Sequence, residues 1–124
     1  MSVTFSDVND PLTHDENSLQ VTGKGANYNN ANAAAILQIM GLYDWENPTL
    51  YGEMSGFEFR KALLVGISNI EIMIYISDGF ETGGFWMASG DWRISEKLGH
   101  YSKIRARLMY MFEQFADSKE IRWG

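Results

Sequence analysis

The chain has 124 residues, which is the size of one domain and long enough to bury a core without disulfides or a structural metal. Hydrophobic residues make up 45% of the sequence and cysteine is absent, so disorder, a disulfide scaffold and thiolate metal sites are excluded. The first residues lack the pattern of a signal peptide, and no apolar run is long enough to span a bilayer. We therefore expect a soluble, cytoplasmic protein without membrane contact.

The formal charge of −6 is unevenly distributed along the chain. Residues 1–91 hold twelve of the sixteen acidic residues and three of the ten basic ones, whereas residues 92–124 are basic on balance. An acidic body disfavours nucleic-acid binding, which depends on neutralising phosphates. The basic C-terminal part leaves a local nucleic-acid contact as a third alternative, although charge complementarity within the molecule explains the polarity more simply.

The N-terminal segment is polar and rich in Asp and Asn. We expect residues 1–27 to form an acidic, partly ordered arm ahead of a compact domain at residues 28–124. Val3–Phe5 and Leu19–Val21 predict short strands within the arm. Its acidic run lacks the spacing of a calcium-binding loop, and its glycines lack the spacing of a phosphate-binding loop.

Residues 29–42 predict a helix around which the rest of the chain packs. Asn29 or Asn30 fits its N-cap, because a short side-chain oxygen accepts a free backbone N–H of the first turn. Gly41 fits the left-handed position that ends many helices. Apolar residues on several sides of this helix predict burial on several sides, with Gln38 at the solvent edge.

An aromatic, acidic loop and a short strand follow, at residues 43–48 and 50–54. Ser55 and Glu58 have the spacing of a capping box, so a second helix begins there, and its apolar spacing continues to about residue 68. Residues 70–77 alternate as in a strand with one buried face. The glycine-rich residues 78–84 and the apolar residues 85–89 then predict a turn and the return strand of a hairpin.

The last long element is a helix with the clearest amphipathic pattern in the chain, at residues 98–115, with Ser95 as its expected cap. Residues 120–124 predict a short strand with Ile121 and Trp123 on one face. The order of elements predicts a single α+β domain in which three helices pack on a small mixed β-sheet that includes a hairpin.

No motif requires a catalytic residue, a cofactor or a metal. The two histidines, His14 and His100, are far apart and lack metal-ligand spacing, and no nucleophile motif accompanies them. We therefore expect no metal site and no cofactor, and the balance is against an enzyme.

Aromatic side chains in the predicted loops and hairpin suggest recognition, because Trp and Tyr give a large contact area for few rotatable bonds. The candidate protein-binding residues are Trp45, Phe80, Phe85, Trp86 and Trp92. The equally weighted alternative is that Phe85 and Trp86 cover the core from the hairpin. The main hypothesis is a small, non-catalytic, cytoplasmic protein-binding domain of the inhibitor, immunity or accessory-subunit type. Its partner is another protein, with a homodimer as an open alternative.

A carboxylate-lined pocket is the alternative hypothesis. Asp44, Tyr51 and Glu53 lie close in sequence, and two carboxylates in different environments can divide the roles of acid and base. That arrangement predicts a small-molecule-binding protein or a weak enzyme.

Overall fold

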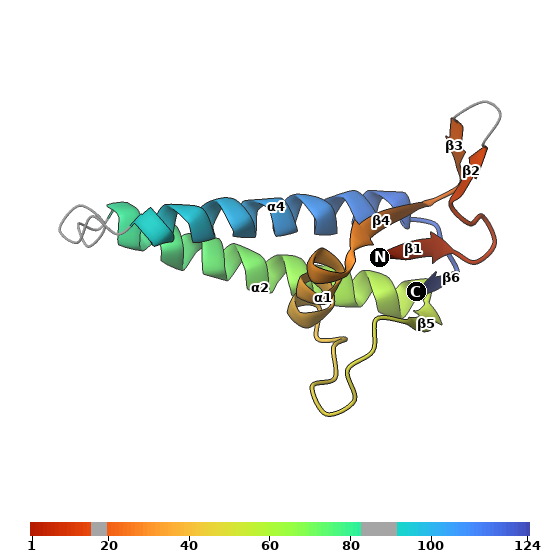
Figure 1. The fold of residues 1–124 in the computed structure, drawn as a ribbon, viewed down its shortest axis with the longest axis horizontal. Coiled ribbons are helices and arrows are strands. Elements are labelled where there is room, and N and C mark those ends of the chain that lie inside the picture. Colours follow the sequence, from red (N-terminus) through yellow and green to blue (C-terminus); the bar gives the residue numbers. More distant parts are fainter. Residues whose placement is uncertain (16–19, 83–91) are drawn as a thin grey trace.

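The computed structural model describes residues 1–15, 20–82 and 92–124, without the side chains of residues 14–15, 20–21, 78–82 and 92–98. Within these ranges, three helices pack against a four-stranded sheet, which confirms the predicted α+β class (Figure 1). The helices are α1 (Asn30–Ile39), α2 (Gly56–Thr82) and α4 (Trp92–Gln114). The sheet contains β1 (Ser2–Asp7), β4 (Gly25–Asn29), β5 (Gly52–Ser55) and β6 (Glu120–Trp123), and β2 (Thr13–Asp15) pairs with β3 (Gln20–Thr22) in a separate ribbon.

The sheet has the order β4-β1-β6-β5, and every neighbouring pair is antiparallel. The prediction of a mixed sheet is therefore wrong. The reason lies in the connection between β5 and β6. Because α2 leaves the sheet directly after β5 and α4 returns to the same end, Glu120 starts β6 opposite Ser55 at the end of β5. The two strands must then run in opposite directions.

The N-terminal segment contributes a central strand of this sheet. β1 pairs with β4 on one side and with β6 on the other. Thr4 exchanges two backbone hydrogen bonds with Gly124, at 3.0 and 3.2 Å, so the two ends of the chain lie side by side. Val3 and Phe5 are buried. The strand expected at Val3–Phe5 is confirmed, and it is an integral part of the sheet.

The core forms where the helices cover one face of the sheet. Phe59 of α2 lies at its centre, with its ring centroid 5.6 Å from Phe115, 5.7 Å from Trp123 and 6.1 Å from Phe5. Ile121 and Trp123 point to this core from β6, as predicted from their spacing. Aromatic pairs in such edge-to-face and tilted arrangements stabilise a core beyond their burial.

Helix α1 has the predicted boundaries. The Asn29 side chain accepts the backbone N–H of Asn32 at 2.8 Å, and Gly41 has the positive φ of 76° that closes the helix. The expected burial on several faces is wrong. Ile36 and Leu37 are fully buried, but the alanine-rich side of α1 opposite to them is exposed or half-buried. Only one face of α1 is therefore buried against the rest of the molecule.

Helix α2 begins as predicted, with the Ser55 hydroxyl accepting the N–H of Glu58 at 3.1 Å. It does not end near residue 68, and the strand predicted at residues 70–77 is wrong, because the helix continues to Thr82. This stretch is apolar at nearly every position, so its alternation of isoleucines does not distinguish a strand from a helix. Ile70 is buried and Ile72 is exposed, as expected for positions about 200° apart on a helix.

Helix α4 packs antiparallel along α2, and the pair extends well beyond the sheet (Figure 1). Ile104, Leu108, Met111 and Phe115 form its buried stripe, as the amphipathic pattern predicted. The helix already begins at Trp92, so the predicted cap at Ser95 is wrong. Gly66 of α2 permits close packing here, because a Cβ at this position would lie 3.1 Å from Met40 of the α1 end and 3.4 Å from Leu108. The return strand predicted at residues 85–89 lies outside the described residues.

Candidate interaction surface

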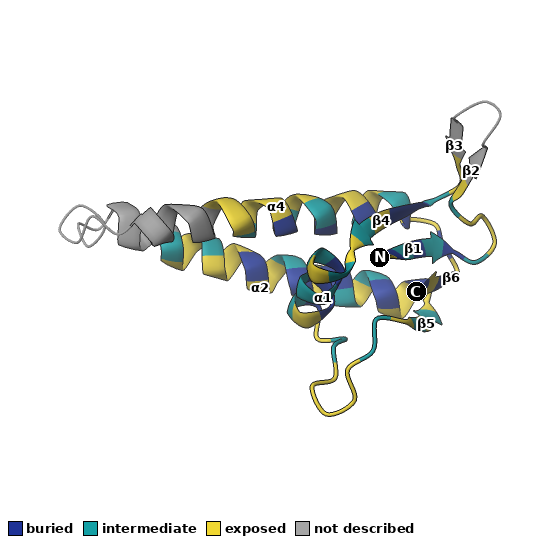
Figure 2. Cartoon of the chain, viewed as in Figure 1, coloured by how far each residue is buried: buried dark blue, intermediate teal, exposed yellow. Residues whose placement is uncertain are grey.

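Helix α2 presents apolar side chains on two opposite faces. The inner face, with Phe59, Leu63 and Ile70, is buried in the core. The outer face also carries large apolar side chains, and each of these exposes between 51% and 79% of its surface: Phe57, Leu64, Val65, Ile72, Tyr75 and Ile76. Figure 2 shows the resulting alternation of buried and exposed residues along the helix.

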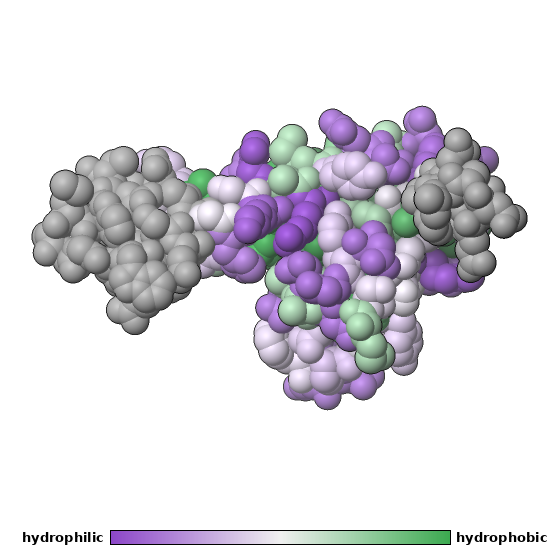
Figure 3. Space-filling model, turned by 45° about the horizontal axis from the view of Figure 1, so that its top comes forward, coloured by the Kyte–Doolittle hydropathy of each residue, from purple (hydrophilic) through white to green (hydrophobic). Residues whose placement is uncertain are grey.

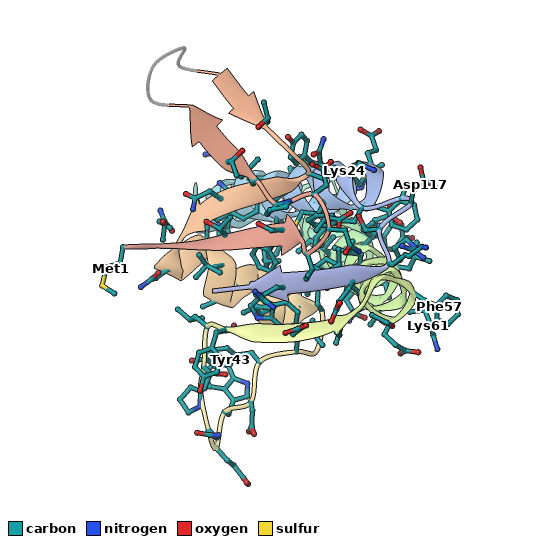
Figure 4. The ribbon with its side chains drawn as sticks, turned by 90° about the vertical axis from the view of Figure 1, so that its right-hand side faces the viewer. Met1, Lys24, Tyr43, Phe57, Lys61 and Asp117 are labelled. Carbon is teal, nitrogen blue, oxygen red and sulfur yellow. The ribbon has the colours of Figure 1, made fainter. Side chains whose placement is uncertain are left out.

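The outer apolar residues form one continuous stripe. They lie on the same side of the α-helix, where Lys61 and Ser68 complete a spacing of three and four residues from Phe57 to Tyr75. Lys61 and Ser68, both exposed, lie within the same stripe. Together these eight residues are called the α2 stripe, which is about 28 Å long for a rise of 1.5 Å per residue. Figure 4 shows Phe57 and Lys61 together on the outer side of α2, pointing away from the rest of the molecule.

The only charged group of the α2 stripe is Lys61. Its ammonium lies 3.9 Å from the carboxylate of Glu58, and it also lies 5.4 Å from the centroid of the Phe57 ring. The Lys61 side chain is 60% exposed, so the ion pair contributes little to stability. The α2 stripe is thus an apolar surface with one cation near its N-terminal end.

Side-chain contacts beside the inner face hold the α2 stripe in place. Arg60 donates hydrogen bonds to the backbone carbonyls of Phe115 and Ser118, at 3.0 and 2.7 Å, and so ties the start of α2 to the end of α4. Glu71 pairs with Arg105 of α4 at 3.1 Å. Asn69 donates to the carbonyl of Ile39 at 3.2 Å. These contacts with α1 and α4 fix the position of α2 in the fold, and so fix the orientation of the α2 stripe.

The face seen in Figure 3 differs in character. The view in Figure 3, toward α1 and α4, is largely hydrophilic, with small hydrophobic patches between charged and polar side chains. The open face of the sheet carries the small polar residues Ser2, Thr4 and Asn27. A pocket lies next to it, lined by Thr4, Ser6 and Arg122 among others, and Asp7 is its one buried titratable group.

The predicted aromatic site is described only in part. Trp45 lies in the loop after α1, is 73% exposed, and contacts Tyr43 edge-to-face with the ring centroids 4.9 Å apart. The other four candidates, Phe80, Phe85, Trp86 and Trp92, lie outside the residues whose side chains the structure describes. Their role in binding stays a prediction.

The residues of the predicted carboxylate pocket lie in two separate parts of the structure. The Asp44 carboxylate accepts the N–H of Glu46 at 2.9 Å in its own exposed loop. Glu53 lies on β5, 3.5 Å from the guanidinium of Arg122. Tyr51, in the same region, is largely exposed. Asp44 and Glu53 thus have separate neighbours, and their joint action stays a prediction.

Glu53 has a carboxylate neighbour that the sequence analysis did not identify. Glu120 lies diagonally across from it on β6, opposite Ser55 and two residues before Arg122. A hydrogen bond with Glu53, together with the negative charge of that carboxylate, raises the pKa of Glu120 above its ordinary value. The sequence alone does not reveal this pair of carboxylates, because only the pairing of β5 with β6 brings the two residues together.

Asp7 is the one buried carboxylate among the described residues, at 5% exposure. Its burial raises the pKa, but hydrogen bonds from the Ser118 hydroxyl at 2.6 Å and the Asn9 N–H at 2.8 Å outweigh this effect. With the charge of Lys24, they hold the pKa of Asp7 below its ordinary value. The carboxylate ties β1 to the turn after α4, and this is a structural role.

Among the side chains that the structure describes, no three His, Asp or Glu residues come together as metal ligands would. None of the described helices is both long and apolar enough to cross a membrane. No family model, curated protein or solved structure matches the chain. The α2 stripe is therefore the strongest candidate site on physical grounds.

Proposed function

We propose that this chain is a non-catalytic protein-binding domain and that the α2 stripe is its contact surface. One observation carries the proposal: six large apolar side chains, each at least half exposed, lie on one face of a helix. Folded monomers rarely leave a contiguous apolar surface of this kind open to water. A helix that presents such a face typically packs against a groove or another helix.

The composition of the α2 stripe fits a protein partner. Phe57 and Tyr75, near its two ends, offer large rigid contact areas, and the aliphatic residues between them offer a smooth surface without strong hydrogen-bonding demands. The exposed Trp45, which packs on the half-buried Tyr43 in the loop after α1, adds a second aromatic contact. An inhibitor, immunity or accessory-subunit role would be consistent with this surface.

Capture of partners from native lysate tests the proposal. Ile72→Glu places a charge in the middle of the α2 stripe and should abolish capture of any specific partner. Gln38→Glu adds the same charge to an exposed position on α1 and should leave capture unchanged. Both variants should melt within a few degrees of the wild type, because neither position is buried. Equal capture by both variants would show that the α2 stripe is not the contact surface.

A carboxylate site is the second candidate function, and the Glu53–Glu120 pair is the observation that favours it. Two carboxylates that share a hydrogen bond beside Arg122 differ in acidity, as acid–base pairs do. Glu120→Gln and Glu53→Gln should then each abolish binding of a small ligand found by screening. If both variants bind it as the wild type does, the carboxylate site is ruled out.

A further inference from the structure

The α2 stripe has an internal symmetry centred on Ser68. Leu64 and Ile72 lie four residues before and after Ser68, and Lys61 and Tyr75 lie seven residues before and after it. Four and seven residues correspond to about one and two helical turns, so all five positions lie on one side of α2. All five residues are exposed. These five of the eight stripe positions are related by the symmetry, whereas Phe57, Val65 and Ile76 have Gly79, Glu71 and Arg60 at their mirrored positions.

Such symmetry matches an antiparallel contact between two identical helices. A two-fold axis through Ser68 places each residue before it opposite the residue at the same distance after it in the other copy. Leu64 then packs against Ile72 of the second copy, and the small Ser68 at the centre permits a close approach of the two helix axes. We propose that the partner of the α2 stripe is a second copy of this chain, packed antiparallel about Ser68.

The charge and aromatic groups of the α2 stripe agree with this register. Lys61 comes opposite Tyr75 of the second copy, which is the most exposed of the six large apolar residues. An ammonium over an aromatic face is favourable, and the two-fold axis makes this contact twice. A partner of another sequence would need its own aromatic or acidic side chain opposite Lys61, whereas a second copy of this chain already provides Tyr75.

The size of the α2 stripe is sufficient for a dimer. With on the order of 200 Å² of surface for a large side chain, six such residues at the observed exposures present roughly 700 Å². Stable complexes bury about 800 Å² per partner, so the α2 stripe and its rim reach the required area. This pairing rests on the proposed function, since it uses the same surface, and it names the partner.

The dependence on salt follows from charge. Two copies with a net charge of −6 each repel one another, and the proposed contact contains no ion pair between copies. Added salt screens that repulsion, so the dimer should tighten or stay unchanged as salt rises. A complex held by opposite charges would instead weaken.

A single cysteine tests the position of the axis, since the chain has no other cysteine. Ser68→Cys should form a disulfide-linked dimer under mild oxidation, because the two Ser68 residues face each other across the axis. Ser102→Cys, on the exposed side of α4, is the matched control and should link at least about tenfold more slowly. Light scattering of the unlinked wild type should give twice the 14.1 kDa mass of one chain.

A charge swap tests the register. Lys61→Glu and Tyr75→Lys should each weaken self-association at least about tenfold. The double variant Lys61→Glu/Tyr75→Lys should recover it, because the new opposite charges again face each other across the axis. Lys61→Glu combined with Tyr110→Lys, an exposed position on α4, should show no recovery.

The outcomes separate the two proposals. A wild type that stays monomeric at high concentration overturns the pairing, while the lysate experiment with Ile72→Glu still decides whether the α2 stripe binds another protein. A dimer that Ser68→Cys does not link and that the charge swap does not restore overturns the antiparallel register. Linkage, loss and recovery together support it.

Discussion

The two faces of α2 share the same kinds of side chain but differ in what covers them. Leu63 and Ile70 on the inner face are fully covered by the sheet, α1 and α4, whereas Leu64 and Ile72 on the outer face stay about half exposed. Burial of an aliphatic side chain is worth about 1.5–3 kcal/mol, so only the inner face stabilises the isolated chain. The outer face keeps that free energy available for a partner. The comparison separates residues that specify the fold from residues free to serve binding.

The sharpest test of this difference uses two isoleucines that are two positions apart. Ile70→Ala should lower the free energy of unfolding by about 2–5 kcal/mol, because it opens a cavity in the core. Ile72→Ala should change it by about 0.5 kcal/mol or less. Urea unfolding of dilute protein measures both. Equal losses would mean that the two residues share one buried face, as in a strand, and would contradict the helix.

This pair also shows where sequence reasoning stops. The capping box at Ser55, the cap at Asn29 and the stripe of α4 were readable because each is a local pattern with one structural meaning. Residues 70–76 were not, because an apolar residue at nearly every position satisfies a strand, a buried helix and a two-faced helix alike. Only the packing partner, α4, decides among these, and it comes later in the chain.

The candidate site was missed for the same reason. With residues 70–77 taken as a strand, Leu64, Ile72 and Tyr75 do not fall on a common face. A helix continued to Thr82 would have shown apolar residues on two opposite sides, which signals burial on both sides or a partner surface. The pairing of Glu53 with Glu120 was inaccessible, because no local pattern fixes which strands become neighbours.

A polar contact at the sheet end of the molecule gives the next largest effect. Ser118→Ala removes the hydroxyl that donates to the buried Asp7 carboxylate, and should cost about 1.5–3 kcal/mol at neutral pH. Because the folded pKa of Asp7 is lowered, its contribution is complete above the unfolded pKa of about 3.9 and is lost as the pH falls through the folded pKa. The difference between variant and wild type should therefore shrink in acid.

Urea unfolding at a series of pH values measures this effect. Ser102→Ala, which removes an exposed hydroxyl from α4, is the control and should match the wild type at every pH. A Ser118→Ala difference that stays constant into strong acid would show that the hydroxyl acts without the charge of Asp7.

A smaller effect comes from the cap of α2, which belongs to neither face. Ser55→Ala should lower the free energy of unfolding by about 1 kcal/mol, because the N–H of Glu58 loses its acceptor. Ser55→Asp keeps an acceptor and should retain most of the stability. Neither variant should alter self-association, since Ser55 lies outside the α2 stripe. If either variant changed self-association, the N-terminal cap of α2 would contribute to the contact made by the α2 stripe.

The smallest effect on stability should come from the outer face itself. Leu64→Ala removes an exposed side chain, and in dilute solution it should shift the free energy of unfolding by no more than about 0.5 kcal/mol. Concentrated protein should behave differently. If the α2 stripe is buried between two copies, association stabilises the folded state, and the melting temperature of the wild type rises with protein concentration. Leu64→Ala should flatten that rise, because each dimer loses two Leu64 contacts with Ile72. An unchanged slope in the variant would place the association on another surface and leave the outer face of α2 without a role in it.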